Sequence, residues 1–558
     1  MSRKKKDAAG DSALNRRGFL RRGVLGGALA FVSPSLAFGE TNDEMKTPSN
    51  MEAAPVKSFE YDEATIGELQ EALTRGRLSA RSLAEKYLTR IEEIDRSGPR
   101  VNSVIETNRD ALAIAEASDA ERKRGSLRGP LHGIPVLIKD NIDTADRMST
   151  TAGSLALVGA KPARDAVIVE RLRAAGAVLL GKTNLSEWAN FRSTHSSSGW
   201  SARGGQTRNP YVLDRNPCGS SSGSGVAVAA NLCAVAVGTE TDGSIVCPAS
   251  ANGVVGIKPT LGLLSGAGII PIAHSQDTAG PMARTVADAA ILLGALAGTG
   301  ERNAAPRDSR RGSALDYTKF LDPAGLRGAR LGIARKFFGF SDKVDKLLAE
   351  AIDTLKRLGA IVVDPADIPS HGKFDDSEFE VLLYEFKADL NAYLARLGGD
   401  ARVRSLKEII RFNEQHRDEE MPYFGQEIFQ KAEEKGPLTS RAYRAALRKN
   451  HLLARAQGID AVMSKHRLDA IVGPTGGPPW TTDLVNGDHF SGGSSTPAAV
   501  AGYPNITVPA GFIHGLPVGI SFFGRADSEP VLIRLAYAFE QATKHRKPPQ
   551  FLPTADLR

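Results

Sequence analysis

Two loops rich in glycine and serine flank one apolar segment, and their hydroxyl groups are candidate nucleophiles. Residues 217–224 read PCGSSSGS and residues 239–248 read TETDGSIVCP. A serine hydroxyl is a weak nucleophile until a neighbouring base takes its proton. The choice of serine therefore depends on where that base lies.

The segment 219–223 matches the pattern G-x-S-x-G, which is typical of the nucleophile turn in α/β-hydrolases. Any loop of glycine and serine produces this match often. The ten histidines are scattered, and no aspartate followed by a histidine in a supporting context comes after the loop. We therefore do not assign a Ser-His-Asp triad.

Lys139 is the alternative base. It ends the apolar segment in HGIPVLIKDN, residues 132–141, and a lysine at the end of such a strand is unusual. Burial would penalise the ammonium form and lower its pKa, so that a neutral amine could accept a proton. The other interpretation is a lysine that extends to solvent or pairs with Asp140.

Further motifs resemble the amidase signature family in their order and close to its spacing. After Lys139 and the two serine loops come GIKPT at 256–260 and DTAGPMARTVAD at 277–288. AGYP at 501–504 and GLPVG at 515–519 continue the resemblance, which spans nearly all of residues 59–545.

The resemblance implies a catalytic triad made of a lysine, a serine that follows a cis peptide bond, and a nucleophilic serine. In the family the two serines stand 24 positions apart, and Ser220 and Ser244 have this separation. The family roles then make Ser244 the nucleophile, Ser220 the bridging serine and Lys139 the base.

The family also forms an oxyanion hole from backbone N–H groups just before the nucleophile. This implies roles for Thr241, Asp242 and Gly243, together with Ser244 itself, and Ser221 matches a supporting hydrogen-bonding position. The sequence departs from the commonest family pattern at Ser222 and at Asp242, where a glycine is usual.

GGQTRNP at 204–210, together with the two serine loops, is similar to the bacterial peptide amidases. This branch implies hydrolysis of C-terminal peptide amides to the free acid and ammonia, without metal or cofactor. The alternatives are an amidase for aryl or fatty amides, a glutamyl-tRNA amidotransferase A-like subunit, and a noncatalytic binding protein of the same fold.

The N-terminus has the features of an export signal. Residues 1–39 hold eight Lys and Arg against two Asp, which accounts for six of the seven net positive charges of the chain. NRRGFL at 15–20 resembles the twin-arginine signal, and the short apolar run after it is followed by a suitable cleavage site. We expect a periplasmic or secreted enzyme, no stable membrane insertion after cleavage and no nucleic-acid partner.

The chain divides into a signal peptide at 1–39, a linker at 40–58 and an amidase signature domain at 59–558. Short apolar segments such as 135–138 and 177–180 alternate with helical patterns such as 166–175. The alternation predicts an α/β fold with a large mixed central sheet flanked by helices. Residues 374–465 are charged and helical in pattern, which predicts a helical cap.

The three cysteines are Cys218, Cys233 and Cys247. An odd and small number does not suggest a disulfide framework. We expect all three to be buried as small apolar side chains.

Overall fold

The computed structural model describes residues 56–297, 316–398 and 401–557. Eleven strands form one mixed sheet in the order β1-β3-β2-β6-β8-β7-β12-β13-β11-β9-β10. The strands are β1 (Val104–Thr107), β2 (Pro135–Lys139), β3 (Val178–Thr183), β6 (Val235–Glu240), β7 (Val255–Lys258), β8 (Thr278–Ala283), β9 (Arg330–Ile333), β10 (Ile361–Val363), β11 (Ala470–Pro474), β12 (Asn505–Ile513) and β13 (Leu516–Phe523).

The central strands β2, β3, β6 and β8 are buried along their whole length. Helices therefore cover both faces of the sheet, as the continuous apolar strands require. The helices outside the cap are α2 (Ile66–Thr74), α3 (Ala80–Arg90), α4 (Ala111–Lys123), α5 (Val167–Ala174), α6 (Ser222–Ala229), α7 (Val246–Ala251), α8 (Val286–Leu296), α9 (Asp342–Arg357), α16 (Thr496–Ala501) and α17 (Glu529–Thr543).

Strand directions bring three chemical groups to one edge of the sheet. β2 and β6 are parallel neighbours, so Lys139 at the end of β2 and the 241–244 turn after β6 lie at the same edge. β8 runs antiparallel to β6 with Thr278 opposite Glu240, which places Asp277 there as well. The topology thus assembles the site from segments far apart in sequence.

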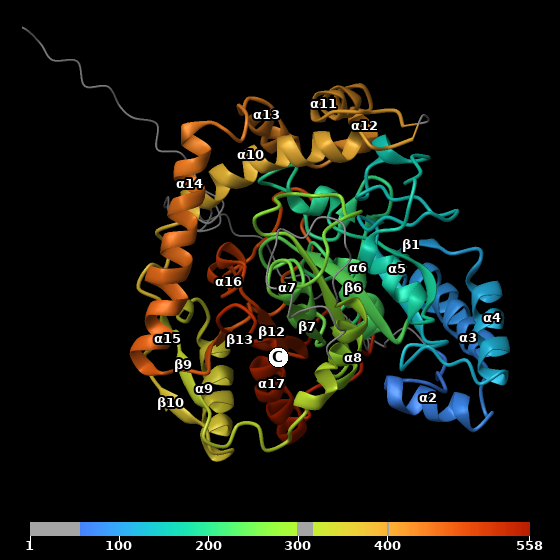
Figure 1. The fold of residues 1–558 in the computed structure, drawn as a ribbon, viewed down its shortest axis with the longest axis horizontal. Coiled ribbons are helices and arrows are strands. Elements are labelled where there is room, and N and C mark those ends of the chain that lie inside the picture. Colours follow the sequence, from blue (N-terminus) through green and yellow to red (C-terminus); the bar gives the residue numbers. More distant parts are fainter. Residues whose placement is uncertain (1–55, 298–315, 399–400, 558) are drawn as a thin grey trace, which may run out of the picture.

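The cap consists of helices that lie over one side of the sheet. Figure 1 shows α10 to α13 along the top and α14 along the left side. Their bounds are α10 (Asp375–Leu394), α11 (Leu406–Gln415), α12 (Arg417–Glu420), α13 (Glu427–Glu433), α14 (Arg441–His451) and α15 (Asp460–His466). Phe386 and Phe429 stack between α10 and α13. The prediction of a helical cap is confirmed.

The predicted α/β fold with a large mixed sheet is also confirmed. The apolar segments 232–237, 254–257, 331–334, 361–363, 470–472 and 518–522 also predict strands, and all of them lie in the sheet, whereas β1, β8 and β12 were not predicted. Strand β8 has the sequence TAGPMA, and glycine and proline argue against a central strand. Its position between β6 and β7 overrides that local preference.

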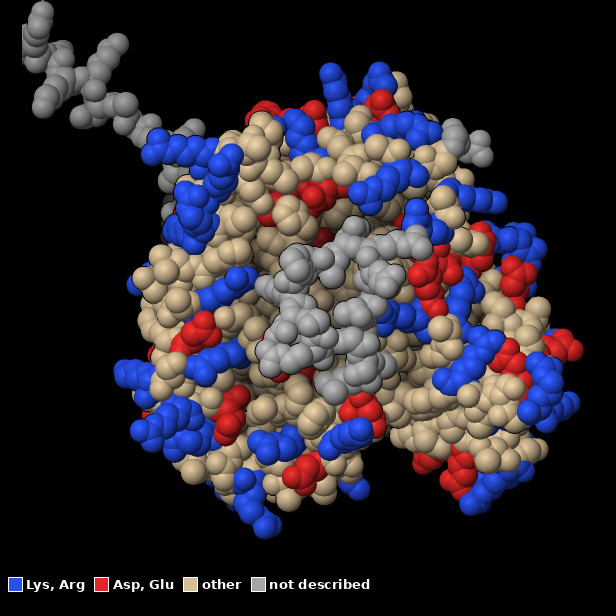
Figure 2. Space-filling model, in the orientation of Figure 1, with Lys and Arg blue, Asp and Glu red and all other residues tan. Residues whose placement is uncertain are grey.

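The predicted signal peptide and most of the predicted linker lie outside the described residues, so the export signal stays a prediction. Among the helices that are described, none has the length and apolar character needed to cross a membrane. Figure 2 shows basic and acidic side chains intermingled on the face that it draws.

Candidate active site

The loop before α6 has an unusual backbone at the serines that the sequence singles out. The peptide bond between Gly219 and Ser220 is cis, as the family resemblance implies. A Cβ atom at Gly219 would lie 2.1 Å from the Ser186 Oγ, so a larger residue would displace this hydroxyl from its bond with the Gly199 N–H. Ser222, which replaces the usual glycine, donates from its Oγ to the Cys218 carbonyl at 2.6 Å. The serine at this position therefore stabilises the loop through a hydrogen bond that a glycine could not make.

Lys139 is fully buried at the end of β2 and points at this loop. Its Nζ lies 2.8 Å from the Ser220 Oγ and 3.1 Å from the Ser221 Oγ. It also contacts the Thr239 Oγ1 at 2.9 Å. Asp140 is not its partner, because no ion pair joins the two side chains within the described chain and Asp140 pairs with Arg203.

These contacts orient the amine. The Ser221 hydroxyl donates to the Thr239 carbonyl at 3.0 Å, so its oxygen accepts from Lys139. A neutral amine has two N–H groups and one lone pair. When its N–H groups point to Ser221 and Thr239, the lone pair faces the Ser220 hydroxyl.

Burial lowers the pKa of Lys139 to about 7, while the carboxyl groups of Asp277 and Glu240 oppose the shift. Desolvation is the largest cause, because a low-dielectric interior disfavours the ammonium form. A substantial fraction of Lys139 is therefore neutral at physiological pH.

Ser244 stands in the turn between β6 and α7 and keeps 7% of its surface exposed. Its carbonyl accepts from the Ser221 N–H at 3.1 Å, which joins this turn to the cis-serine loop. The Glu240 carboxylate accepts from the N–H groups of Ile245 and Val246 and so holds the first turn of α7. Gly243 has φ +79°, a conformation that favours glycine.

Thr241 and Asp242, which belong to the predicted oxyanion hole, are held in place by contacts of their side chains. Thr241 donates from its Oγ1 to the Asp277 carboxylate at 2.6 Å. The Asp242 carboxylate accepts from the hydroxyls of Ser495 at 2.6 Å and Thr496 at 2.8 Å. Asp242 thus links the turn to the start of α16.

Several backbone N–H groups of this turn make no hydrogen bond within the described protein. Within the described part of the chain, the N–H groups of Asp242, Gly243 and Ser244 donate to no protein acceptor. Asp242 and Gly243 also line a cavity. N–H groups without a protein acceptor at a cavity wall are the arrangement that stabilises an oxyanion.

Sequence reasoning missed the side chains that support this turn. Asp277 belongs to one of the family motifs, but the sequence alone predicts no role for it. Gln276 donates from its Nε2 to the Thr241 carbonyl at 3.2 Å and to the Glu378 Oε1 at 3.1 Å. Asp277 comes just before β8, and its contact with Thr241 depends on the pairing of β8 with β6, which the sequence does not show.

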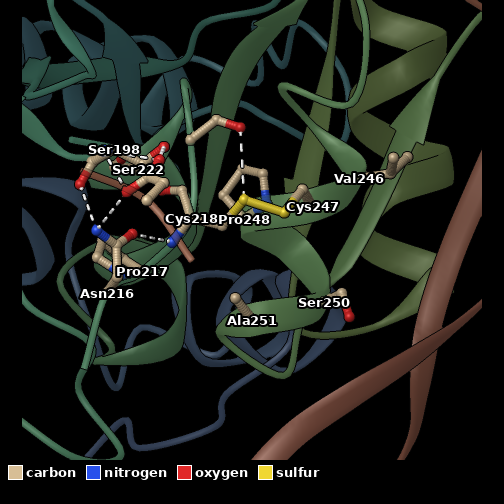
Figure 3. The surroundings of a disulfide bond; sticks show 12 residues. Ser198, Asn216, Pro217, Cys218, Ser222, Val246, Cys247, Pro248, Ser250 and Ala251 are labelled. Atoms are coloured by element: carbon tan, nitrogen blue, oxygen red, sulfur yellow. Dashed lines mark hydrogen bonds between the residues drawn. A yellow bond between two sulfur atoms is a disulfide. The ribbon is translucent and has the colours of Figure 1, made fainter. Parts of the chain in front are cut away.

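The expectation for the cysteines was wrong for two of the three. Cys218 and Cys247 form a disulfide with their Cα atoms 6.0 Å apart, and Cys233 stays a buried thiol. Figure 3 shows that the bond joins the cis-serine loop to α7. The two cysteines are 29 positions apart and come together because the cis-serine loop packs against the turn before α7, where the Ser221 N–H donates to the Ser244 carbonyl. The disulfide therefore ties together the segments that carry Ser220 and Ser244.

A cavity opens between the two serine loops and the cap, and its wall includes Gly243, the residue before Ser244. Its apolar wall includes Val246, Phe379 and Leu382, and the loop that leads to α16 adds Trp480 and Phe490. Such a mixture of apolar surface and a few polar groups is typical of a ligand site.

The fold and this site define an amidase. The family model described as Amidase matches residues 82–533, and the chain belongs to that family. It is an enzyme that hydrolyses C–N amide bonds.

Its similarity to particular proteins covers most of the chain. The structure of the native peptide amidase of Stenotrophomonas maltophilia is 53% identical, with a TM-score of 0.84, over 88% of this chain and all of that one. A probable amidase of Arabidopsis thaliana is 47% identical over 89% of this chain and 93% of its own. A putative amidase of Arthroderma benhamiae is 39% identical over 87% of this chain and 86% of its own.

Proposed function

We propose that this amidase hydrolyses the C-terminal amide of peptides through a Ser244-Ser220-Lys139 triad. The observation that carries the mechanism is the 2.8 Å contact between the Lys139 Nζ and the Ser220 Oγ, in a cis-peptide loop bonded to the Ser244 backbone. A buried lysine with a lowered pKa is a suitable proton acceptor.

In the first half of the reaction, the Ser244 Oγ attacks the amide carbon. Its proton passes to the Ser220 Oγ while the Ser220 proton passes to the Lys139 Nζ. The carbonyl oxygen becomes an oxyanion, which the N–H groups of the 242–244 turn stabilise. The Lys139 ammonium then returns its proton through Ser220 to the amide nitrogen. The C–N bond breaks, ammonia leaves, and the acyl group stays on Ser244.

In the second half, water attacks the acyl-enzyme and gives up a proton by the same route. A second oxyanion forms, the ester bond breaks, and the Ser244 hydroxyl is restored. The products are a carboxylic acid and ammonia. Each step needs only the three side chains and the backbone donors.

The likeness to a solved peptide amidase supports the peptide substrate. A small leaving group such as ammonia fits a closed leaving-group site, whereas a longer chain would clash with its wall. We therefore expect strict selection for the terminal amide and wide tolerance of peptide sequence.

Mass spectrometry of an amidated peptide tests this substrate. Incubation should add about one dalton, the difference between an amide and an acid, and leave the internal peptide bonds intact. Parallel incubations with aryl amides, fatty amides and glutamine, each followed by ammonia release, give the comparison. Internal cleavage, or faster turnover of fatty amides, would contradict the peptide assignment and leave the amidase mechanism standing.

We further propose that the enzyme acts outside the cytoplasm. The twin-arginine pattern and the Cys218–Cys247 disulfide both support this, because disulfides persist in oxidising compartments. Changing Arg16 and Arg17 to lysine should retain the precursor in the cytoplasm. Alkylation of acid-quenched cells and mass spectrometry should then find both cysteines as thiols. Unchanged export of this variant would contradict the proposal.

A further inference from the structure

The cavity between the two serine loops and the cap has a marked charge asymmetry. Four carboxylate side chains line it, those of Asp242, Asp375, Glu378 and Asp488. Among the described residues at its wall there is no lysine and no arginine, and His195 is the one basic side chain there. Carboxylates therefore face an incoming substrate from the 241–244 turn, from cap helix α10 and from the loop that leads to α16.

The donors to two of these carboxylates are neutral. Asp242 accepts from two hydroxyls, and Asp488 accepts from the Ser198 N–H at 3.0 Å and its hydroxyl at 2.5 Å. Neither aspartate is within salt-bridge distance of a lysine or arginine in the described chain, although the buried Lys258 interacts with Asp242 and His489 interacts with Asp488 at longer range. Neutral donors stabilise a carboxylate without cancelling its charge. Burial raises the pKa of Asp488 to about 6, which leaves it largely ionised at neutral pH.

Glu378 lies close to the reacting groups. Only 8% of its surface is exposed, and its Oε1 accepts from the Gln276 amide, which also donates to the Thr241 carbonyl. A single side chain therefore separates this carboxylate from the turn that carries Ser244. Charges at such a short range and low exposure are poorly screened by solvent.

We propose that this cavity selects amide substrates that carry a positive charge near the scissile amide and disfavours those that carry a carboxylate there. The charge would come from a lysine or arginine side chain or from a free α-ammonium group. The inference rests on the proposed peptide-amide function and names its substrate class. Like-charge contacts in a partly buried site oppose binding strongly, so the carboxylate product is also repelled after each turnover.

Four dipeptide amides test the inference with the wild-type enzyme. Three are acetyl-alanyl amides that end in lysine, norleucine or glutamate, and the fourth is alanyl-norleucine amide with a free α-amine. We expect kcat/KM for ammonia release at pH 7.5 to be about tenfold or more higher for lysine than for glutamate, with acetylated norleucine between them. A higher kcat/KM for alanyl-norleucine amide than for its acetylated counterpart would show that the cavity also recognises a free α-ammonium group.

Variants of the cap then test whether its carboxylates cause the preference for positively charged substrates. Glu378→Gln keeps an acceptor for Gln276 and should lower the lysine-to-glutamate ratio severalfold. Glu434→Gln, at an exposed position of the same cap, is the matched control and should leave the ratio unchanged. If Glu378→Gln does not fold, Asp375→Asn at the start of α10 replaces it.

The outcomes separate the two claims. Equal rates for lysine, norleucine and glutamate, or a preference for glutamate, would overturn the charge inference while the peptide-amide function stood. If none of the four substrates released ammonia, the proposed function would be overturned, and the charge inference with it.

Discussion

Replacing Ser244 by alanine is expected to lower kcat for amide hydrolysis by about 10⁴- to 10⁶-fold, because no acyl-enzyme can form. Ammonia release from a C-terminal peptide amide measures the loss. Removal of one hydroxyl at a site that is 7% exposed should not unfold the protein, so the thermal unfolding temperature should stay close to that of the wild type.

Three further variants make this expectation specific. Ser220→Ala interrupts the path to Lys139 and should be severe, with more residual activity than Ser244→Ala. Ser126→Ala, at an exposed position, should keep wild-type turnover. If Ser244→Ala kept wild-type turnover while Cys218→Ala lost it, the assignment of the nucleophile would be wrong.

Local sequence was sufficient for the main strands and for the candidate reactive groups. A lysine that ends an apolar strand and two serines 24 positions apart are features of short segments, and they identify a family with a known arrangement. The alternation of apolar segments and helices predicts the sheet because its central strands are buried along their length. The structure then places Lys139 against Ser220, and Ser221 against the backbone of Ser244.

The supporting contacts could not be predicted in this way, because they depend on strand order. Asp277 reaches Thr241 only because β8 pairs with β6, although its sequence argues against a strand. Ser495 lies 253 positions from Asp242, and no local pattern connects them. The Cys218–Cys247 disulfide likewise needs the cis-serine loop to meet the first turn of α7. Contacts of this kind join segments that are far apart in sequence, so composition and periodicity cannot predict them.

The dependence of activity on pH follows from the burial of Lys139. A general base must be neutral before it accepts a proton, and burial lowers the pKa of Lys139 to about 7. Below this pH the ammonium form dominates and cannot accept the Ser220 proton. Above it the amine is neutral. We therefore expect kcat/KM to rise with pH through about 7 and then to level off.

Asp277 titrates in the same range, because burial raises its pKa to about 7. The two groups interact, so the observed midpoint belongs to the pair. The Asp277 carboxylate raises the pKa of Lys139, against the effect of burial. Asp277→Asn should therefore move the rising limb to lower pH. A shift to higher pH would contradict this electrostatic account.

Removal of the base itself should have an effect comparable to that of Ser244→Ala. Lys139→Ala leaves Ser220 without a proton acceptor, and kcat/KM for ammonia release should fall by several orders of magnitude at every pH between about 5 and 9. Lys139→Arg introduces a guanidinium group that stays protonated in this pH range. Because the relay needs a neutral amine, this variant should be as inactive as Lys139→Ala. Lys346→Ala, at an exposed position of α9, is the control and should retain the wild-type profile. Wild-type activity in Lys139→Arg would show that the lysine acts only through its charge, because an arginine cannot supply the lone pair that the proton relay needs.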